Sequence, residues 1–306
     1  MNKGFQAGWW LTALTIALMY AISLPLLYIN LEINEFVLSL AGEIGLVIPI
    51  LIGIFYDRNN SRGICDTLGI KKFSPILLPL CVLMIIGAQS FIAYTTMPVQ
   101  VLLVIMFGAE TSTTQMLIPN TVPSFMLAFF VLCIAAPVLE ELLCRGVLIK
   151  LFSRYGFTVS VISSALAFSI LHLEMRSFIQ IFFIGLILAT VRICSGSVLL
   201  TIIMHSVNNL LSLLQLVFLD SGAVGLIYPF LLFSALLFPV TIYITFVHLV
   251  KHLDFGMITS SVKAKTGISV AAILCFILFA GFNLMLFINR LINGYCFAEL
   301  KGLLGI

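Results

Sequence analysis

The stretch 123–149 reads PSFMLAFFVLCIAAPVLEELLCRGVLI and decides the class of fold. It exceeds the roughly 20 mostly apolar residues that a helix needs to cross the hydrocarbon core of a bilayer. It also contains two adjacent carboxylates, Glu140 and Glu141, followed by Arg145. An ionisable group at bilayer depth costs about 2.5–3.5 kcal/mol on insertion scales and usually faces a bundle interior or a cavity. The stretch therefore predicts a transmembrane helix with one specialised face.

The composition of the whole chain agrees with a membrane location. Of its 306 residues, 62% are hydrophobic and 9% are charged, whereas soluble domains carry about 25% charged residues. We therefore expect an all-α, polytopic transmembrane bundle in the cell membrane, with the lipid bilayer as its surroundings. The net charge of +3 and the lack of a long basic run argue against a nucleic-acid partner. The seven cysteines form no CxxC pair, which argues against a disulfide framework or a thiolate zinc site.

Apolar runs of spanning length predict about eight or nine transmembrane helices in a single membrane domain, 1–306. The uncertainty lies in the last run, which could be peripheral, and in 97–122, which could be re-entrant or could extend the third span. The candidate spans are 8–30, 36–56, 75–96, 123–149, 157–174, 178–193, 197–219, 226–249 and 267–289.

The loop charges predict the orientation. Basic residues concentrate in alternate loops, and such residues favour the cytoplasmic side. We therefore expect the N-terminus to be cytoplasmic. The residues that carry this argument are Lys3, Arg58, Arg62, Lys71, Lys72, Lys150, Arg154, Arg192, Lys251, Lys263 and Lys265.

Helical spacing separates the ionisable residues of the fourth span. Glu141 and Arg145 are four residues apart, so their side chains share one face of the helix. Glu140 lies about 100° around the helix and cannot share that contact equally well. The pattern predicts one carboxylate paired with arginine and one available for chemistry. The alternative is that the three residues only mark a cytoplasmic helix end.

Two later spans carry polar residues with the same four-residue spacing. Phe168 and His172 share a face in the fifth span, and His205 and Asn209 share one in the seventh. Taken alone, each would be explained by hydrogen bonding between helices, as we expect for Asn208.

Two further polar features have ordinary structural explanations. An interhelical hydrogen bond or an outer position explains Glu43. A location at the membrane edge explains His248 and His252.

Together the motifs are more specific than any one of them. Glu140-Glu141-xxx-Arg145, Phe168-xxx-His172 and His205-xxx-Asn209 follow one another on three spans. This order resembles the CAAX-processing and bacteriocin-processing (Abi) family of intramembrane proteases, whose motifs are EExxxR, FxxxH and Hxxx(D/N). The resemblance covers about 123–215, an expected catalytic core flanked by accessory helices in 1–122 and 220–306.

The resemblance implies an endopeptidase that acts on a membrane-embedded or lipidated peptide or protein. It implies that Glu140 and His172 activate a water, that His205 and Asn209 stabilise the oxyanion, and that Glu141 and Arg145 orient Glu140. A metalloprotease reading uses Glu140, His172 and His205 as ligands to Zn²⁺, and the sequence leaves this open.

Two other functions also stay open at this point. A proton-coupled transporter uses the same residue types, and a catalytically silent relative could act in bacteriocin immunity or as a scaffold. The substrate and the oligomeric state are not predicted.

Overall fold

The computed structural model is helical, and it describes residues 3–28, 35–59, 61, 63–107, 119, 121–175, 177–222, 224–251 and 270–292. No β-strand occurs among these residues, which confirms the all-α prediction. The α-helices are α1 (Lys3–Tyr28), α2 (Glu35–Ile44), α3 (Val47–Asp57), α4 (Ile64–Leu68), α5 (Leu77–Phe107), α6 (Val122–Phe130), α7 (Ala136–Glu141), α8 (Ile149–Phe152), α9 (Phe157–Leu171), α10 (Phe178–Ser195), α11 (Val198–Asp220), α12 (Val224–Lys251) and α14 (Val270–Ile292).

Seven helical segments in the described part are long and apolar enough to cross a membrane. Two shorter apolar helices, Phe157–Leu171 and Ala271–Gly281, match the fifth and ninth predicted spans. The protein is therefore an integral, multi-pass membrane protein, and the predicted number of spans is close. The third span continues as α5 to Phe107, so 97–107 extend it, while 108–118 and 120 lie outside the described residues.

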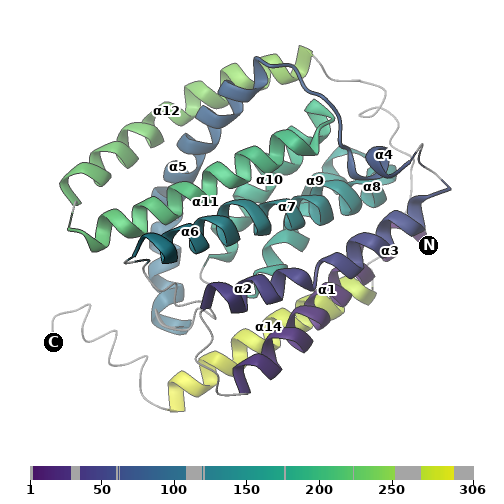
Figure 1. Cartoon of the computed structure of the whole chain (residues 1–306), viewed down its shortest axis with the longest axis horizontal. Coiled ribbons are helices and arrows are strands. Elements are labelled where there is room, and N and C mark those ends of the chain that lie inside the picture. Colours follow the sequence, from purple (N-terminus) through teal and green to yellow (C-terminus); the bar gives the residue numbers. More distant parts are fainter. Residues whose placement is uncertain are drawn as a thin grey trace.

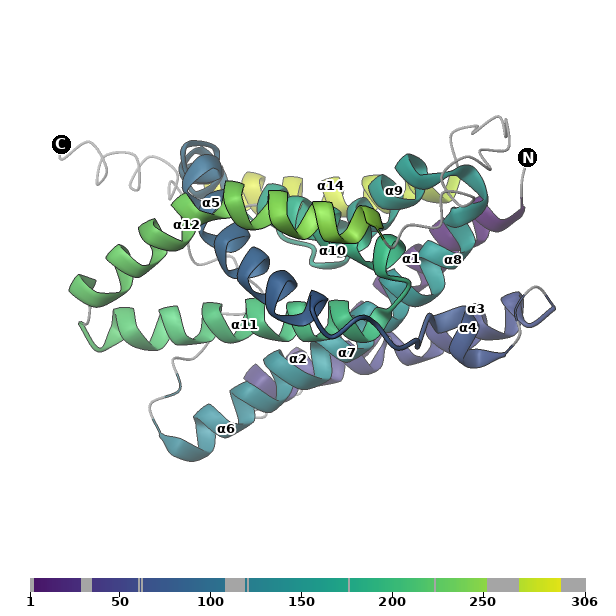
Figure 2. The same cartoon turned by 90° about the horizontal axis from the view of Figure 1, so that it is seen from above.

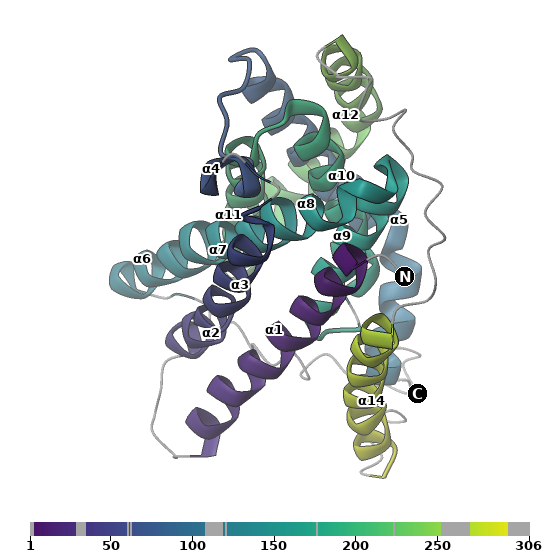
Figure 3. The same cartoon turned by 90° about the vertical axis from the view of Figure 1, so that its right-hand side faces the viewer.

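The helices form a central group with a helix pair on either flank. Helices α5 and α12 lie side by side on one flank, and α1 and α14 lie together on the other (Figures 1 and 3). Between them run α7, α9, α10 and α11, and the three sequence motifs lie along α7, α9 and α11. Helices α2 and α3 run alongside the α6–α8 span (Figure 2) and contact it. The motif helices are thus enclosed by other helices on several sides.

The span Val122–Phe152 is one continuous helix whose α-helical hydrogen-bond register is interrupted twice. It begins at a capping box, in which Thr121 and Ser124 bond to each other's backbone N–H. Two π-helical segments, η1 (Val131–Ala135) and η2 (Leu142–Leu148), interrupt the α-helical register on either side of α7. Such wide turns are rare and often occur at functional sites. Here they flank the two glutamates and include Arg145.

Close backbone approaches hold this span against its neighbours. A Cβ on Gly53 of α3 would lie 2.2 Å from Cγ1 of Val147, and one on Gly8 of α1 would lie 2.5 Å from the Phe152 ring. Val147 and Phe152 belong to the largest buried cluster, which also contains Trp9. Glycine therefore lets α1 and α3 pack directly on the segment that carries Arg145.

Candidate active site

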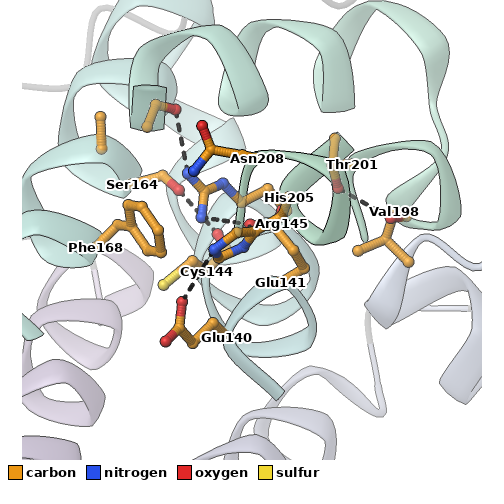
Figure 4. Close-up of polar contacts among 12 residues, drawn as sticks. Glu140, Glu141, Cys144, Arg145, Ser164, Phe168, Val198, Thr201, His205 and Asn208 are labelled. Carbon is orange, nitrogen blue, oxygen red and sulfur yellow. Dashed lines mark hydrogen bonds and ion pairs between the residues drawn. The ribbon is translucent and has the colours of Figure 1, made fainter. Parts of the chain in front are cut away.

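A fully buried ion pair occupies the centre of the site. The Arg145 guanidinium donates to Glu141 Oε1 at 2.8 Å, and neither side chain is exposed. Arg145 also donates to the carbonyl of Gly185 on α10 at 3.2 Å and lies 4.2 Å above the ring of Phe168 (Figure 4). The contact predicted from the four-residue spacing is present. The guanidinium in addition ties the helix to α9 and α10.

His205 lies between the two glutamates. Its Nδ1 is 3.0 Å from Glu141 Oε1, and its Nε2 is 3.6 Å from Glu140 Oε2 (Figure 4). A carboxylate paired with arginine can only accept, so Nδ1 carries the hydrogen and Nε2 of a neutral ring holds a lone pair. Glu141 thereby orients His205 as an acceptor that points toward Glu140.

The two adjacent glutamates differ in access. The Glu140 side chain is 14% exposed, and the Glu141 side chain is fully buried. Glu140 Oε2 has no hydrogen-bond partner within 3.5 Å. Helix geometry thus gives the neighbours different surroundings, as their spacing predicted.

The ring of Phe168 organises three polar side chains. Besides Arg145 above it, His172 and His205 meet the ring edge-on, with centroids 4.7 and 5.4 Å away. His172 Nδ1 lies 2.8 Å from the Phe168 carbonyl oxygen, which can only accept, so this nitrogen carries a hydrogen. The phenylalanine of the FxxxH motif therefore contacts residues from all three motif helices.

His172 lies at a depth comparable with that of Glu140, because α9 is short. At 1.5 Å per residue, Glu140 is about 18 Å from the end of α8, and His172 is about 22 Å from the start of α9. The chain then turns at Leu173, whose φ of 55° lies in the left-handed region. This conformation is unfavourable for leucine, and its side chain packs against the largest buried cluster. The predicted span to 174 thus ends slightly earlier, at Leu171, and His172 is the next residue.

Asn209 contacts the backbone of the fourth span. The N–H of Ala136 bonds to the carbonyl of Val131, five residues back. In that register the carbonyl of Leu132 would need the N–H of residue 137, which is Pro137 and has none. Asn209 Nδ2 donates to the Leu132 carbonyl at 2.8 Å and satisfies it. Asn208 donates to Asn209 Oδ1 at 3.3 Å, so it supports its neighbour.

The structure does not gather the predicted zinc ligands. No group of three His, Cys, Asp or Glu side chains in the described ranges has an arrangement that could hold a metal ion. The residues Glu140, His172 and His205 therefore do not fit that ligand set in this conformation. His248 Nδ1 contacts the Ile244 carbonyl at 2.9 Å, and His252 lies outside the described residues.

Sequence reasoning missed two residues that hold the site together. Gly185 supplies the carbonyl that Arg145 binds, and a Cβ there would lie 3.2 Å from Cα of Ala165. Ser164, fully buried on α9, donates to the Cys144 carbonyl at 2.9 Å. Small residues inside apolar spans were the only signal, and such residues are common wherever membrane helices approach closely.

The fold and the site together define the class of this protein. It is a multi-pass membrane protein with a buried cluster of glutamate, histidine and arginine side chains. Residues 122–211 match the family model described as "Type II CAAX prenyl endopeptidase Rce1-like". The matched segment contains all three motifs, which confirms the resemblance seen in the sequence. It also supports an intramembrane protease at the level of the family.

One curated relative also matches. The chain is 31% identical over 112 residues to an Escherichia coli protein described as "Uncharacterized 24.3 kDa protein". The alignment covers 35% of this chain and 52% of the relative, so the chain spans about half of that relative's length. No solved structure matches the chain.

Proposed function

We propose that the protein is an intramembrane endopeptidase that hydrolyses a peptide bond of a membrane-embedded or lipidated substrate. The observation that carries the proposal is the placement of His205 between two glutamates, with Nδ1 3.0 Å from Glu141 and Nε2 3.6 Å from Glu140. The match of 122–211 to the CAAX prenyl endopeptidase family supports this choice over the proton-coupled transporter.

In the proposed reaction, Glu140 and His205 activate a water. The water lies beside Glu140 Oε2 and His205 Nε2, and one of these groups takes its proton as the hydroxyl adds to the peptide carbonyl. Glu141 remains ionised beside Arg145 and stabilises the His205 ring when the ring becomes positively charged. The proton then passes to the leaving amine, and the carbon–nitrogen bond breaks.

The oxyanion requires donors that are already in place. We assign this role to His172 and Asn209. Asn209 uses one amide hydrogen on the Leu132 carbonyl and retains a second one. His172 has its Nδ1 hydrogen on the Phe168 carbonyl, so a protonated ring would donate from Nε2. The two histidines thus exchange the roles that the resemblance implied.

We also propose that the end of the bundle formed by α4 and α8 is cytoplasmic. Lys71, Lys150 and Arg192 line one cavity there, together with Asp66. Basic residues at one end of a bundle favour the cytoplasmic side. A prenylated peptide would then reach the site from the cytoplasmic leaflet.

Peptide cleavage by protein purified into liposomes tests the function. The probe is a fluorogenic farnesylated peptide that ends in three residues after the modified cysteine. We expect cleavage by wild type and a loss of at least about 100-fold in Glu140→Gln, since general-base catalysis contributes roughly 10²–10⁴-fold. The matched control is Asp220→Asn, an exposed carboxylate at the end of α11. Cleavage by Glu140→Gln at the wild-type rate would refute the role of Glu140.

A further inference from the structure

The cavity beside α4 and α8 lies at one end of the bundle, away from the glutamates of the first motif (Figure 1). The described residues that line it include three cationic side chains, from Lys71, Lys150 and Arg192, and one carboxylate, from Asp66. Its volume is about 100 Å³, and one water takes up about 10–15 Å³ of such space. The cavity therefore has room for a phosphate group.

The two lysines share the carboxylate of Asp66. Lys150 Nζ lies 3.0 Å from Asp66 Oδ2, and Lys71 Nζ lies 3.5 Å from Asp66 Oδ1. Lys150 is also 4.0 Å from Asp57 Oδ2, and the Asp57 side chain is 3% exposed. With both carboxylates counted, three cations against two leave one net positive charge around the cavity. The Lys71 side chain is 57% exposed, so an ion can reach this charge from the water.

Arg192 is the cation without a carboxylate partner. Its Nε is buried and has no hydrogen-bond partner, and across the described ranges no Asp or Glu oxygen lies within 4.0 Å of its guanidinium nitrogens. A guanidinium presents its donors in a planar fork that matches the oxygens of a phosphate. The protein therefore holds a charged group in the wall of the cavity and leaves it without a counter-ion from these segments.

The segment that follows α4 fixes Arg192 in place. Gly69 has a φ of 69°, and a Cβ on it would overlap the Arg192 guanidinium. The Gly69 carbonyl accepts from the N–H of Val198 at 2.9 Å, and the Lys71 carbonyl accepts from the hydroxyl of Ser197. These bonds hold the segment on the turn between α10 and α11. The segment thus covers the guanidinium and brings Lys71 to the same cavity.

The cavity lies where four apolar helices begin or end. Helix α8 ends at Phe152 and α9 begins at Phe157, while α10 ends at Ser195 and α11 begins at Val198. The ends of transmembrane helices lie at the level of the lipid headgroups, and basic pockets between such helices bind anionic headgroups. The N-cap of α9, Gly156, also lines the cavity, and no side chain caps this helix. Its N-terminus adds partial positive charge.

We propose that this cavity binds a phosphate group, held by Arg192 together with Lys71 and Lys150. A phospholipid headgroup and a free phosphate ion both supply this chemistry. The inference is independent of the proposed function, because Glu140 lies about 18 Å along the fourth span from the end of α8.

Isothermal titration calorimetry on the full-length protein in an uncharged detergent tests the proposal. The probes are inorganic phosphate, dioctanoyl phosphatidylglycerol and dioctanoylglycerol, which has the same acyl chains without the phosphate. We expect one-to-one binding of at least one phosphate probe and none of dioctanoylglycerol. Binding of the phospholipid alone would identify a lipid headgroup as the source, and binding of inorganic phosphate alone would identify the free ion. Failure of both phosphate probes to bind overturns the proposal, as does equal binding of dioctanoylglycerol and the phospholipid.

Three variants locate the binding. Arg192→Met should weaken the affinity about 10- to 100-fold, the size expected from one charge-assisted hydrogen bond. The matched control is Arg58→Met, which removes the same charge from an exposed side chain outside the cavity and should change the affinity less than twofold. Equal losses in the two variants overturn the assignment of the site.

The third variant leaves all three cations in place. Ser153→Asp puts a second carboxylate into the lining and should weaken the affinity at least about 10-fold, because like charges repel. It keeps the proposal testable if Arg192→Met does not fold, and thermal unfolding is measured on every variant. Wild-type affinity in a folded Ser153→Asp overturns the proposal.

Discussion

Removal of Arg145 is the sharpest test of the buried cluster. The guanidinium holds three contacts at once, with Glu141 at 2.8 Å, with the Gly185 carbonyl at 3.2 Å and with the Phe168 ring at 4.2 Å. Arg145→Met keeps most of the volume and leaves Glu141 buried without its counter-ion. Breaking a buried pair in this way costs about 3–5 kcal/mol. Because His205 Nδ1 still contacts Glu141 Oε1 at 3.0 Å in this variant, we expect the lower end, about 3 kcal/mol.

A double variant shows whether the loss of stability comes from the unpaired charge or from lost packing. In the double variant Glu141→Leu/Arg145→Met no unpaired charge remains, and apolar replacements of buried pairs are often neutral or stabilising. We therefore expect the double variant to be at least as stable as Arg145→Met alone. Additive losses, or a loss below about 1 kcal/mol in Arg145→Met, would refute the reasoning.

Unfolding by SDS in mixed micelles supplies the measurement. Tryptophan fluorescence reports it, since Trp9 is 2% exposed and its ring centroid lies 6.0 Å from that of Phe152. The control is Lys71→Met. The Lys71 side chain is 57% exposed and pairs with Asp66 at 3.5 Å, and such surface pairs contribute about 0–1 kcal/mol.

Three further substitutions test other contacts of the site. Asn209→Leu should lower the free energy of unfolding by about 1–3 kcal/mol, because it leaves the part-buried Leu132 carbonyl without a donor; an unchanged SDS midpoint would contradict this. Gly53→Ala should destabilise by about 1–3 kcal/mol through overpacking against Val147, whereas wild-type stability would mean that the helices move apart freely. Phe168→Leu should reduce kcat for the peptide even where the protein stays folded, since both motif histidines lose their ring contact. A kcat equal to that of wild type would show that the ring does not orient them.

Contacts within one helix could be predicted from the sequence, and contacts between helices could not. The spacing of Glu141 and Arg145 predicts their contact because 3.6 residues per turn fixes which side chains share a face. The approach of His205 to both glutamates depends on how α11 packs against α7, and no periodicity in the chain encodes that.

The role of Asn209 depended on a detail of backbone register. Its spacing from His205 predicted a shared face, and this favoured a common role with that histidine. The π-helical turn and the missing N–H of Pro137 create a carbonyl at Leu132 that needs a donor. Proline in a helix predicts some disruption, but the carbonyl that loses its partner differs between an α-helical and a π-helical register. The sequence therefore shows the proline that leaves a carbonyl without a partner, but it does not show which carbonyl this is.

The different surroundings of Glu140 and Glu141 bear on why the first motif has two acids. A single glutamate cannot both neutralise a buried arginine and remain accessible to a water. In this chain Glu141 is fully buried against Arg145 and holds the Nδ1 hydrogen of His205, while Glu140 keeps 14% of its side chain exposed. Adjacent positions on a helix differ by about 100°, which is enough to separate the two environments. This division of surroundings supports Glu140 as the reacting carboxylate in the proposed mechanism. It also predicts that Glu141→Gln impairs the orientation of His205 more than it changes the access of water to Glu140.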